Sequence, residues 1–246
     1  MEPKITDRDA YSRTKMLIGE EALKKIIDSH VAVFGLGGVG CGVIEGLARA
    51  GVGRFTLVDF DKVSESNINR QLIADTSTVG KLKTDAVRDR IIRINPTAKV
   101  TAYEIFYSEE NAELVDLSGV DYIVDAIDSV RSKVILIQRA KKENIPIISC
   151  MGTGNRIDAL GFEICDIYKT SGCPLARVMR HELRKKGVES LKVLCSRSDI
   201  YISPDKDKIK ADEKGCPPAS ISYVPPVAGF IISGEVIKDI AQIKSK

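Results

Sequence analysis

The sequence contains no C-x-x-C pair, no apolar run long enough to cross a bilayer and no apolar segment at its beginning. A membrane-spanning helix needs about 18 consecutive apolar residues. The longest candidate, residues 224–237, is shorter and is interrupted by Pro225, Pro226, Gly229 and Glu235. The first residues, Met-Glu-Pro-Lys, lack the apolar region of a secretory signal. These absences predict a cytoplasmic protein without a membrane partner.

The six cysteines, at positions 41, 150, 165, 173, 195 and 216, are spaced too widely for the paired ligands of a zinc knuckle. A disulfide framework is not expected in a chain of this length without a secretion signal. Reduced thiols buried as small apolar side chains are the simplest interpretation. Two alternatives stay open: Cys195 as a thiol acceptor in sulfur transfer, and Cys173 with Cys216, each before a proline in a predicted loop, as a surface redox pair.

The composition, 43% hydrophobic and 29% charged with a net charge of +3, is that of a soluble globular chain and excludes extensive disorder. The charge is concentrated in residues 169–197, which hold eight basic and two acidic side chains. Such a surface attracts phosphate-rich partners, and a solvated helix face is the alternative. The candidate contacts are Arg177, Arg180, Arg184, Lys185 and Lys186, with His181 solvated or on phosphate.

Strands and helices are predicted to alternate along the first 150 residues. The expected strands are 30–34, 54–60, 100–106, 122–127 and 146–150; the expected helices are 11–29, one ending at 50, 81–94, 108–117 and 130–143. This alternation predicts an α/β, Rossmann-like, doubly wound and mostly parallel sheet with helices on both faces. The C-terminal third is more elaborate, with strands at 162–168, 190–195 and 219–223 and helices at 175–186 and 227–243. No repeat or linker divides the chain.

The segment Gly35-Leu-Gly-Gly-Val-Gly40 follows the first strand and opens a helix, which fits a G-x-G-x-x-G loop at Gly35, Gly37 and Gly40 with Gly38 in addition. Its glycines permit close approach to phosphate, and the helix N-terminus offers free N–H groups. Asp59 ends the second strand, where a carboxylate binds ribose hydroxyls. The loop predicts a nucleotide ligand and does not separate NAD from ATP.

Further polar residues follow the strands at the same sheet edge. The segments Asp59-Phe-Asp61 and Ser66-Asn-Ile-Asn-Arg-Gln71 lie within 13 residues, and Lys83 begins the next helix. Arg70 and Lys83 suit a triphosphate on which negative charge develops. Asp128 follows the fourth strand, and a carboxylate facing polyphosphate is typical of a bound magnesium ion. Exposure to solvent in a loop is sufficient to explain any one of these polar residues. It does not explain why all of them lie at the same edge of the predicted sheet.

These motifs, with Ala126-Ile-Asp-Ser129, resemble the adenylation domain of the ubiquitin-activating-enzyme superfamily over about residues 7–150. The resemblance implies a single adenylating domain of ThiF type over residues 1–246 that uses ATP and magnesium to form an acyl-adenylate. It implies an ATP site formed by the glycines 35, 37, 38 and 40 with Asp59 on ribose, Asp61 beside it, Asn67, Arg70 and Lys83 on phosphate, and Asp128 on magnesium. It also implies that Arg13 reaches the other subunit's ATP in a homodimer.

Within this superfamily, the molybdopterin and thiamin branches hold zinc with two C-x-x-C pairs, which this chain lacks. Residues 125–131, 169–170, 174–176 and 220–225 instead resemble the tRNA threonylcarbamoyladenosine dehydratases, although Cys173 stands where that family has an acidic residue. This resemblance implies ATP-dependent cyclisation of threonylcarbamoyladenosine in tRNA, through adenylation of its threonine carboxylate. The basic stretch would then contact the tRNA substrate, and no protein nucleophile would be required.

Three other functions stay open. The first is activation of the C-terminus of a small sulfur-carrier protein, together with a sulfur-transfer partner. The second is a nucleotide-binding scaffold, and the third is hydride transfer with NAD. The last does not require the combination of Arg70, Lys83 and Asp128.

Overall fold

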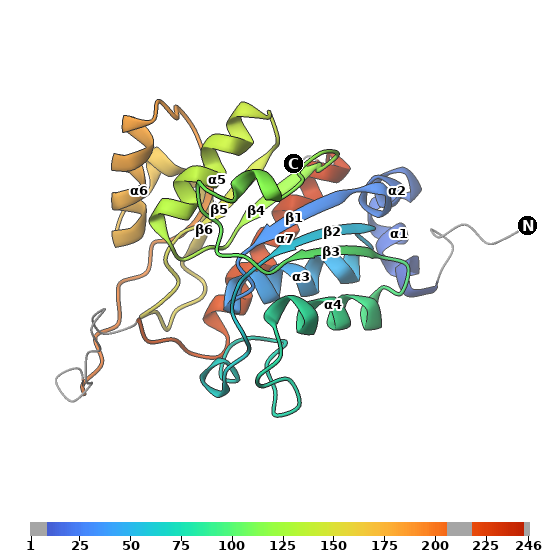
Figure 1. Ribbon diagram of the computed structural model, residues 1–246, viewed down its shortest axis with the longest axis horizontal. Helices are drawn as coiled ribbons and strands as arrows, with labels where there is room; N and C mark the ends of the chain where they lie inside the picture. The colour runs from blue at the N-terminus through green and yellow to red at the C-terminus, as the bar shows by residue number, and fades with distance from the viewer. Residues whose placement is uncertain (1–8, 206–217, 244–246) are drawn as a thin grey trace, which may run out of the picture.

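The computed structural model describes residues 9–205 and 218–243 and is built on one seven-stranded sheet (Figure 1). The strand order is β3-β2-β1-β4-β5-β7-β6. Every pairing is parallel except that of β6 with β7. The strands are β1 (His30–Phe34), β2 (Arg54–Val58), β3 (Lys99–Tyr103), β4 (Tyr122–Asp125), β5 (Ile147–Cys150), β6 (Phe162–Asp166) and β7 (Lys192–Ser196). The predicted mostly parallel α/β fold is confirmed.

Helices cover both faces of this sheet (Figure 1). On β1, Val31 and Val33 pack into the core beneath α3, α4 and α7, whereas Ala32 and Phe34 pack into the core beneath α5 and α6. Because successive strand residues point to opposite faces, a strand buried on both sides is continuously apolar. The helices are α1 (Ser12–Ile18), α2 (Glu20–Asp28), α3 (Gly38–Ala50), α4 (Lys83–Ile94), α5 (Val130–Lys142), α6 (Pro174–Lys185) and α7 (Val224–Ala241).

Three predicted elements are interrupted, reduced to a turn or absent in the structure. The helix expected over 11–29 is broken at Gly19, which has a φ of 84° and separates α1 from α2. The helix expected over 108–117 is reduced to the 3-10 turn Ala112–Leu114. Residues 219–223 do not form a strand, because Asn155 takes both hydrogen bonds of Ala219: its N–H donates to the Ala219 carbonyl and its Oδ1 accepts from the Ala219 N–H.

The last helix begins earlier than expected, at Val224, and includes Pro225 and Pro226 in its first turn. Proline is tolerated there because the N–H groups of a first helical turn have no partner within the helix. None of the helices in the two described ranges combines the length and hydropathy that a membrane span requires.

The chain changes direction across the sheet at β1. Strand β2 pairs with one side of β1 and β4 with the other, and both pairings are parallel. In doubly wound sheets, ligands bind beyond the carboxyl ends of the strands at such a point. The structure therefore places the expected ligand site beyond Phe34, Val58 and Asp125.

Candidate active site

A cavity of about 840 Å³ lies at this sheet edge. It is large enough for a nucleotide together with part of a second reactant. Its wall gathers most of the predicted ATP-site residues from five separate segments of the chain: Gly35, Gly37, Gly38, Asp59, Asp61, Asn67, Arg70, Lys83 and Asp128. The residues expected elsewhere, namely Arg13 and the basic residues of α6, do not line it.

The glycine loop is held tightly against the turn that follows β4. Gly35 has a φ of +85°, and a Cβ atom on it would lie 2.5 Å from the Ala126 carbonyl oxygen. A Cβ atom on Gly40 would lie 1.9 Å from the Gly35 carbonyl oxygen. A Cβ atom on Gly37, in contrast, would meet nothing within 4 Å. The backbone at Gly37 and the start of α3 is thus accessible from the cavity, as a phosphate cradle requires.

Asp59 holds this loop in place. Its Oδ2 accepts a hydrogen bond from the Leu36 N–H at 2.6 Å, and its Oδ1 accepts one from the Asp61 N–H at 2.8 Å. Burial raises the pKa of Asp59, and the nearby Lys83 ammonium opposes this effect. Each carboxylate oxygen retains a second lone pair for a ribose hydroxyl. Asp59 therefore has a structural task in addition to its predicted role, one that spacing alone did not indicate.

Two cations face the cavity near Asp59. The Lys83 ammonium is buried and lies 2.7 Å from Asp61 Oδ2. The Arg70 guanidinium is half-buried and donates to the Ser66 carbonyl at 2.9 Å and to Asn69 Oδ1 at 2.7 Å. Hydrogen bonds to residues 61–69 hold both side chains in place. The Lys83 and Arg70 side chains thus supply positive charge to the cavity without a rearrangement of the sheet.

Asn67 and Asp128 complete this half of the cavity. Asn67 is buried, and its Oδ1 accepts from the Ser64 N–H in a capping box around a short 3-10 turn. Asp128 is exposed, on the turn between β4 and α5. Asp128 follows β4, whereas Asp61 follows β2, and these two strands lie on opposite sides of β1. The Asp128 carboxylate and the Lys83–Asp61 pair therefore line the cavity from the two sides of the switch point.

The other half of the cavity is formed by segments that the sequence did not assign to the site, residues 150–156 and the start of α6. Arg156 is 3% exposed, and its guanidinium donates to the Gly152 and Ser198 carbonyls. The sequence does not indicate Arg156, because no motif surrounds it. Its position depends on the hydrogen bond to the carbonyl of Ser198, which is 42 residues away in the sequence.

Cys173 also lines this half, buried at the N-terminus of α6 and not in a surface loop as predicted. The neighbouring Cys195 side chain lowers the pKa of Cys173, against the effect of burial, and the pKa of Cys195 is raised in turn. Cys195 is 1% exposed in β7, as expected for a structural cysteine. The predicted partner Cys216 lies outside the described residues.

Comparison with known proteins agrees with this geometry. Residues 11–246 match the model of the ThiF family. The chain belongs to the ThiF family. It is 42% identical to the tRNA threonylcarbamoyladenosine dehydratase of Bacillus subtilis over 238 residues, which cover 94% of each chain. It superimposes on the crystal structure of the Escherichia coli tRNA N6-threonylcarbamoyladenosine dehydratase in complex with ATP with a TM-score of 0.86, at 31% identity, covering 97% of this chain and 96% of that one.

A third relative of this ThiF-family chain matches it over a shorter part of the sequence. The molybdopterin-synthase adenylyltransferase of Escherichia coli is 40% identical over 132 residues, which are 53% of this chain and 51% of that protein. The similarity to the dehydratases thus extends over nearly the whole chain, whereas that to the adenylyltransferase covers about half. The predicted resemblance is confirmed, including its branch.

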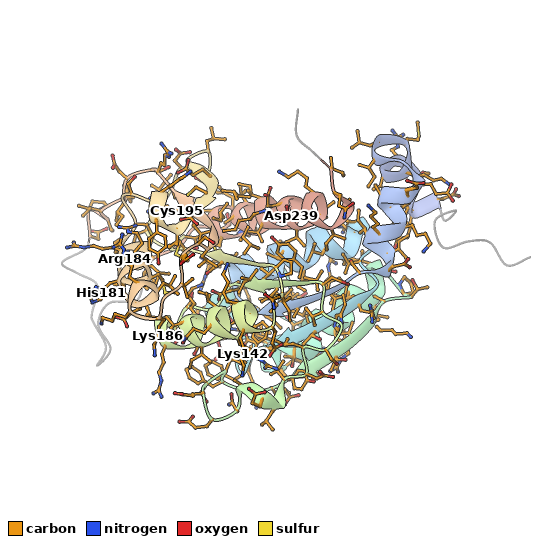
Figure 2. All side chains as sticks on the ribbon, turned by 90° about the horizontal axis from the view of Figure 1, so that it is seen from above. Lys142, His181, Arg184, Lys186, Cys195 and Asp239 are labelled. Atoms are coloured by element: carbon orange, nitrogen blue, oxygen red, sulfur yellow. The ribbon has the colours of Figure 1, made fainter. Side chains whose placement is uncertain are left out.

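The basic residues that were predicted to contact tRNA lie on α6 or, for Lys186, at its C-cap, and the first turn of α6 borders the cavity. Figure 2 shows His181, Arg184 and Lys186 together at the end of the molecule away from α1 and α2. Arg177, Arg184, Lys185 and Lys186 are exposed, and Arg184 lies over the Tyr168 ring at 5.0 Å. Arg180 differs from the prediction of an exposed contact: it is half-buried, and its guanidinium donates to the Thr170 carbonyl and hydroxyl.

Arg13 is exposed on α1, at the end of the molecule opposite α6 (Figure 1). It cannot reach the cavity of its own chain, whose lining excludes α1. Its neighbours Met16 and Leu17 are 86% and 85% exposed. Two large apolar side chains in water beside an arginine are typical of a surface that another protein covers.

Proposed function

We propose that the protein is an ATP-dependent tRNA threonylcarbamoyladenosine dehydratase. One observation carries this proposal: a single cavity joins a nucleotide cradle to a second compartment that borders the first turn of basic helix α6. ATP fits the first compartment and a modified nucleoside fits the second, with the tRNA backbone along α6. Because β6 and β7 of the C-terminal third belong to the same sheet as β1, we also propose one adenylating domain over residues 1–246.

The reaction removes one water from the nucleoside at the expense of ATP. An oxygen of the threonine carboxylate attacks the α-phosphorus of ATP, and pyrophosphate leaves. The neighbouring carbamoyl group then attacks the activated carbonyl carbon, the ring closes, and AMP leaves with the former carboxylate oxygen. Since the nucleophile belongs to the substrate, the protein contributes mainly by orienting the two reactants and by neutralising charge.

The cavity residues divide this work. The start of α3 and Asn67 bind the phosphates. Arg70 and Lys83 stabilise the negative charge that develops on the leaving pyrophosphate. Asp59 accepts hydrogen bonds from the ribose hydroxyls. Asp128 fits a magnesium ion, because Mg²⁺ takes one or two carboxylates and draws its other ligands from phosphate and water. No larger cluster of metal ligands occurs in the described part of the chain. Magnesium, when bound, neutralises charge on the triphosphate.

The decisive experiment is incubation of the protein with ATP, magnesium and tRNA that carries threonylcarbamoyladenosine. We expect the mass of the nucleoside to fall by one water and AMP to form in equal amount. If ATP binds and no AMP appears, the protein is a scaffold. Pyrophosphate exchange that requires a small protein ending in Gly-Gly would favour a sulfur-carrier activator. The sulfur-transfer partner belongs to that alternative and stays a prediction. Binding of NADH without ATP would indicate hydride transfer.

We propose that the exposed cations of α6 contact phosphates of the tRNA. An Arg177→Ala/Lys186→Ala variant is expected to weaken tRNA binding and to reduce the slope of log affinity against log salt by about 2, roughly one unit for each lost phosphate contact. A Lys24→Ala/Lys99→Ala variant is the matched control, since both lysines are exposed but lie on α2 and at the amino end of β3. Equal salt slopes for the two variants, measured by filter binding, would contradict this footprint.

We propose further that Arg13 acts in the cavity of a second copy, so that the active form is a homodimer. Arg13→Ala and Arg70→Ala are each expected to be nearly inactive alone, whereas a mixture of the two should regain activity. In a mixed dimer, the subunit with an intact Arg70 receives Arg13 from its partner. A mixture that stays inactive, under conditions where sedimentation shows exchange of subunits, would contradict the proposal. Leu17→Glu should shift the sedimentation toward the monomer.

A further inference from the structure

A fully buried ion pair lies directly behind the turn that carries Asp128. The Lys133 ammonium donates to Asp125 Oδ2 at 3.0 Å and to Ser149 Oγ at 3.2 Å, and the Ser149 hydroxyl donates to the same Asp125 oxygen at 2.5 Å. The side chains of Lys133, Asp125 and Ser149 are all 0% exposed. None of the three lines the cavity, so the proposed chemistry does not use them.

Stability alone is a weak reason for such a pair. Removing a lysine and an aspartate from water is costly, and an apolar pair of similar volume is often as stable or more stable. In contrast, removing only one partner leaves an uncompensated charge in the core. The pair is therefore better explained by something that it holds in place.

The contacts show what that is. Asp125 is the last residue of β4, and its other oxygen, Oδ1, accepts a hydrogen bond from the Ile127 N–H at 3.1 Å. Lys133 lies in the first turn of α5, where its backbone N–H makes the ordinary helical hydrogen bond to the carbonyl of the N-cap residue Ser129 at 3.0 Å. The pair therefore joins the last residue of β4 to the first turn of α5, the two elements that flank residues 126–129, and Ser149 ties it to the neighbouring strand β5. Asp128 is the only carboxylate on that turn.

The same turn also presses on the glycine loop. The Ala126 N–H donates to the Phe34 carbonyl at 2.8 Å, and the Ala126 carbonyl leaves no room for a Cβ atom on Gly35. A shift of the turn would consequently move Asp128 relative to the phosphate cradle. Groups that orient a metal ligand commonly change metal affinity or activity about 10- to 100-fold when they are removed.

We propose that Lys133 and Asp125 form a positioning pair that fixes Asp128 at the distance from the phosphate cradle that magnesium-bound ATP requires. Neither residue touches the nucleotide; both act through the turn of residues 126–129. The inference rests on the proposed function, in which Asp128 faces magnesium. It makes the buried pair a determinant of metal-dependent nucleotide binding and not of nucleotide binding as such.

The test compares ATP binding by calorimetry with magnesium and with a chelator. The double variant Asp125→Asn/Lys133→Met removes both charges and avoids an unpaired one; Ser149→Ala keeps the pair and removes one donor. For the double variant we expect magnesium-dependent ATP binding to weaken at least about tenfold, and ATP binding in chelator to change less than about twofold. Ser149→Ala should give a smaller change of the same kind. Lys141→Met, on the exposed side of α5, is the matched control and should change neither.

A double variant that melts at a lower temperature but binds ATP as the wild type does, with and without magnesium, would show that the pair is only structural. Equal weakening under both conditions would also overturn the inference, since it would indicate a damaged cavity and not a misplaced Asp128. If the wild type fails to dehydrate the tRNA, the proposed function is contradicted, and the magnesium dependence of ATP binding still tests the pair separately.

Discussion

Replacing Arg70 with alanine is expected to slow the ATP-dependent dehydration about 100- to 1,000-fold, the loss that follows removal of one group which stabilises transition-state charge. The guanidinium lines the cavity, and its two hydrogen bonds go to Ser66 and Asn69 in its own segment. Folding should therefore persist. The measurement is the rate of AMP formation in a single turnover, with the melting temperature recorded in parallel.

Two further variants make the Arg70 result specific. Arg70→Lys keeps the charge but loses the planar, two-pronged donor geometry, so we expect an intermediate rate. Arg88→Ala is the matched control, because Arg88 lies on α4, pairs with Asp85 at 2.8 Å and does not line the cavity. An unchanged rate for Arg70→Ala would contradict the proposed chemistry and favour the scaffold alternative.

The fold was predictable where local pattern and buried strands coincide. Strands β1, β2 and β4 are mostly apolar runs that are followed by the predicted site residues, and α3 follows Gly37 directly, so both the parallel sheet and the edge with the cavity were predictable from the sequence. The prediction of a strand at residues 219–223 was wrong because their sequence, Ala-Ser-Ile-Ser-Tyr, has the short alternation of side chains that is typical of a strand. Their backbone instead bonds to Asn155, 64 residues away, and no local pattern records such a contact.

The site was predictable in its nucleotide half and much less so in the other half. Three of the four loop glycines, with Asp59, Arg70 and Lys83, follow strands at recognisable spacing and line one cavity, whereas the predicted Gly40 does not line it and packs against the Gly35 carbonyl. Arg156 and the Lys133–Asp125 pair carry no such spacing, since their roles depend on which backbone groups the fold brings to them. Charge counting has the same limit: Arg180 contributes to the basic stretch but turns inward to Thr170.

The glycine loop offers a pair of matched substitutions that separate folding from nucleotide binding. Gly35→Ala is expected to lower the free energy of unfolding by about 3 kcal/mol, because a left-handed backbone costs an L-residue about 1–2 kcal/mol and overpacking typically costs 1–3 kcal/mol. The new Cβ atom would lie 2.5 Å from the Ala126 carbonyl oxygen, which is itself fixed by the turn. Urea denaturation measures this loss.

Gly37→Ala should behave in the opposite way. Its φ of −77° suits any residue, and a Cβ atom would meet nothing within 4 Å, so the free energy of unfolding should stay within about 0.5 kcal/mol of the wild type. Gly37 nonetheless lines the cavity at the start of α3, where the added methyl group would occupy space that the phosphates need. ATP binding should therefore weaken severalfold in calorimetry while stability is kept. A stable Gly37→Ala protein with unchanged ATP affinity would show that the phosphates do not approach the backbone there, and the cradle would have to be sought at Gly38 and the residues of α3 that follow.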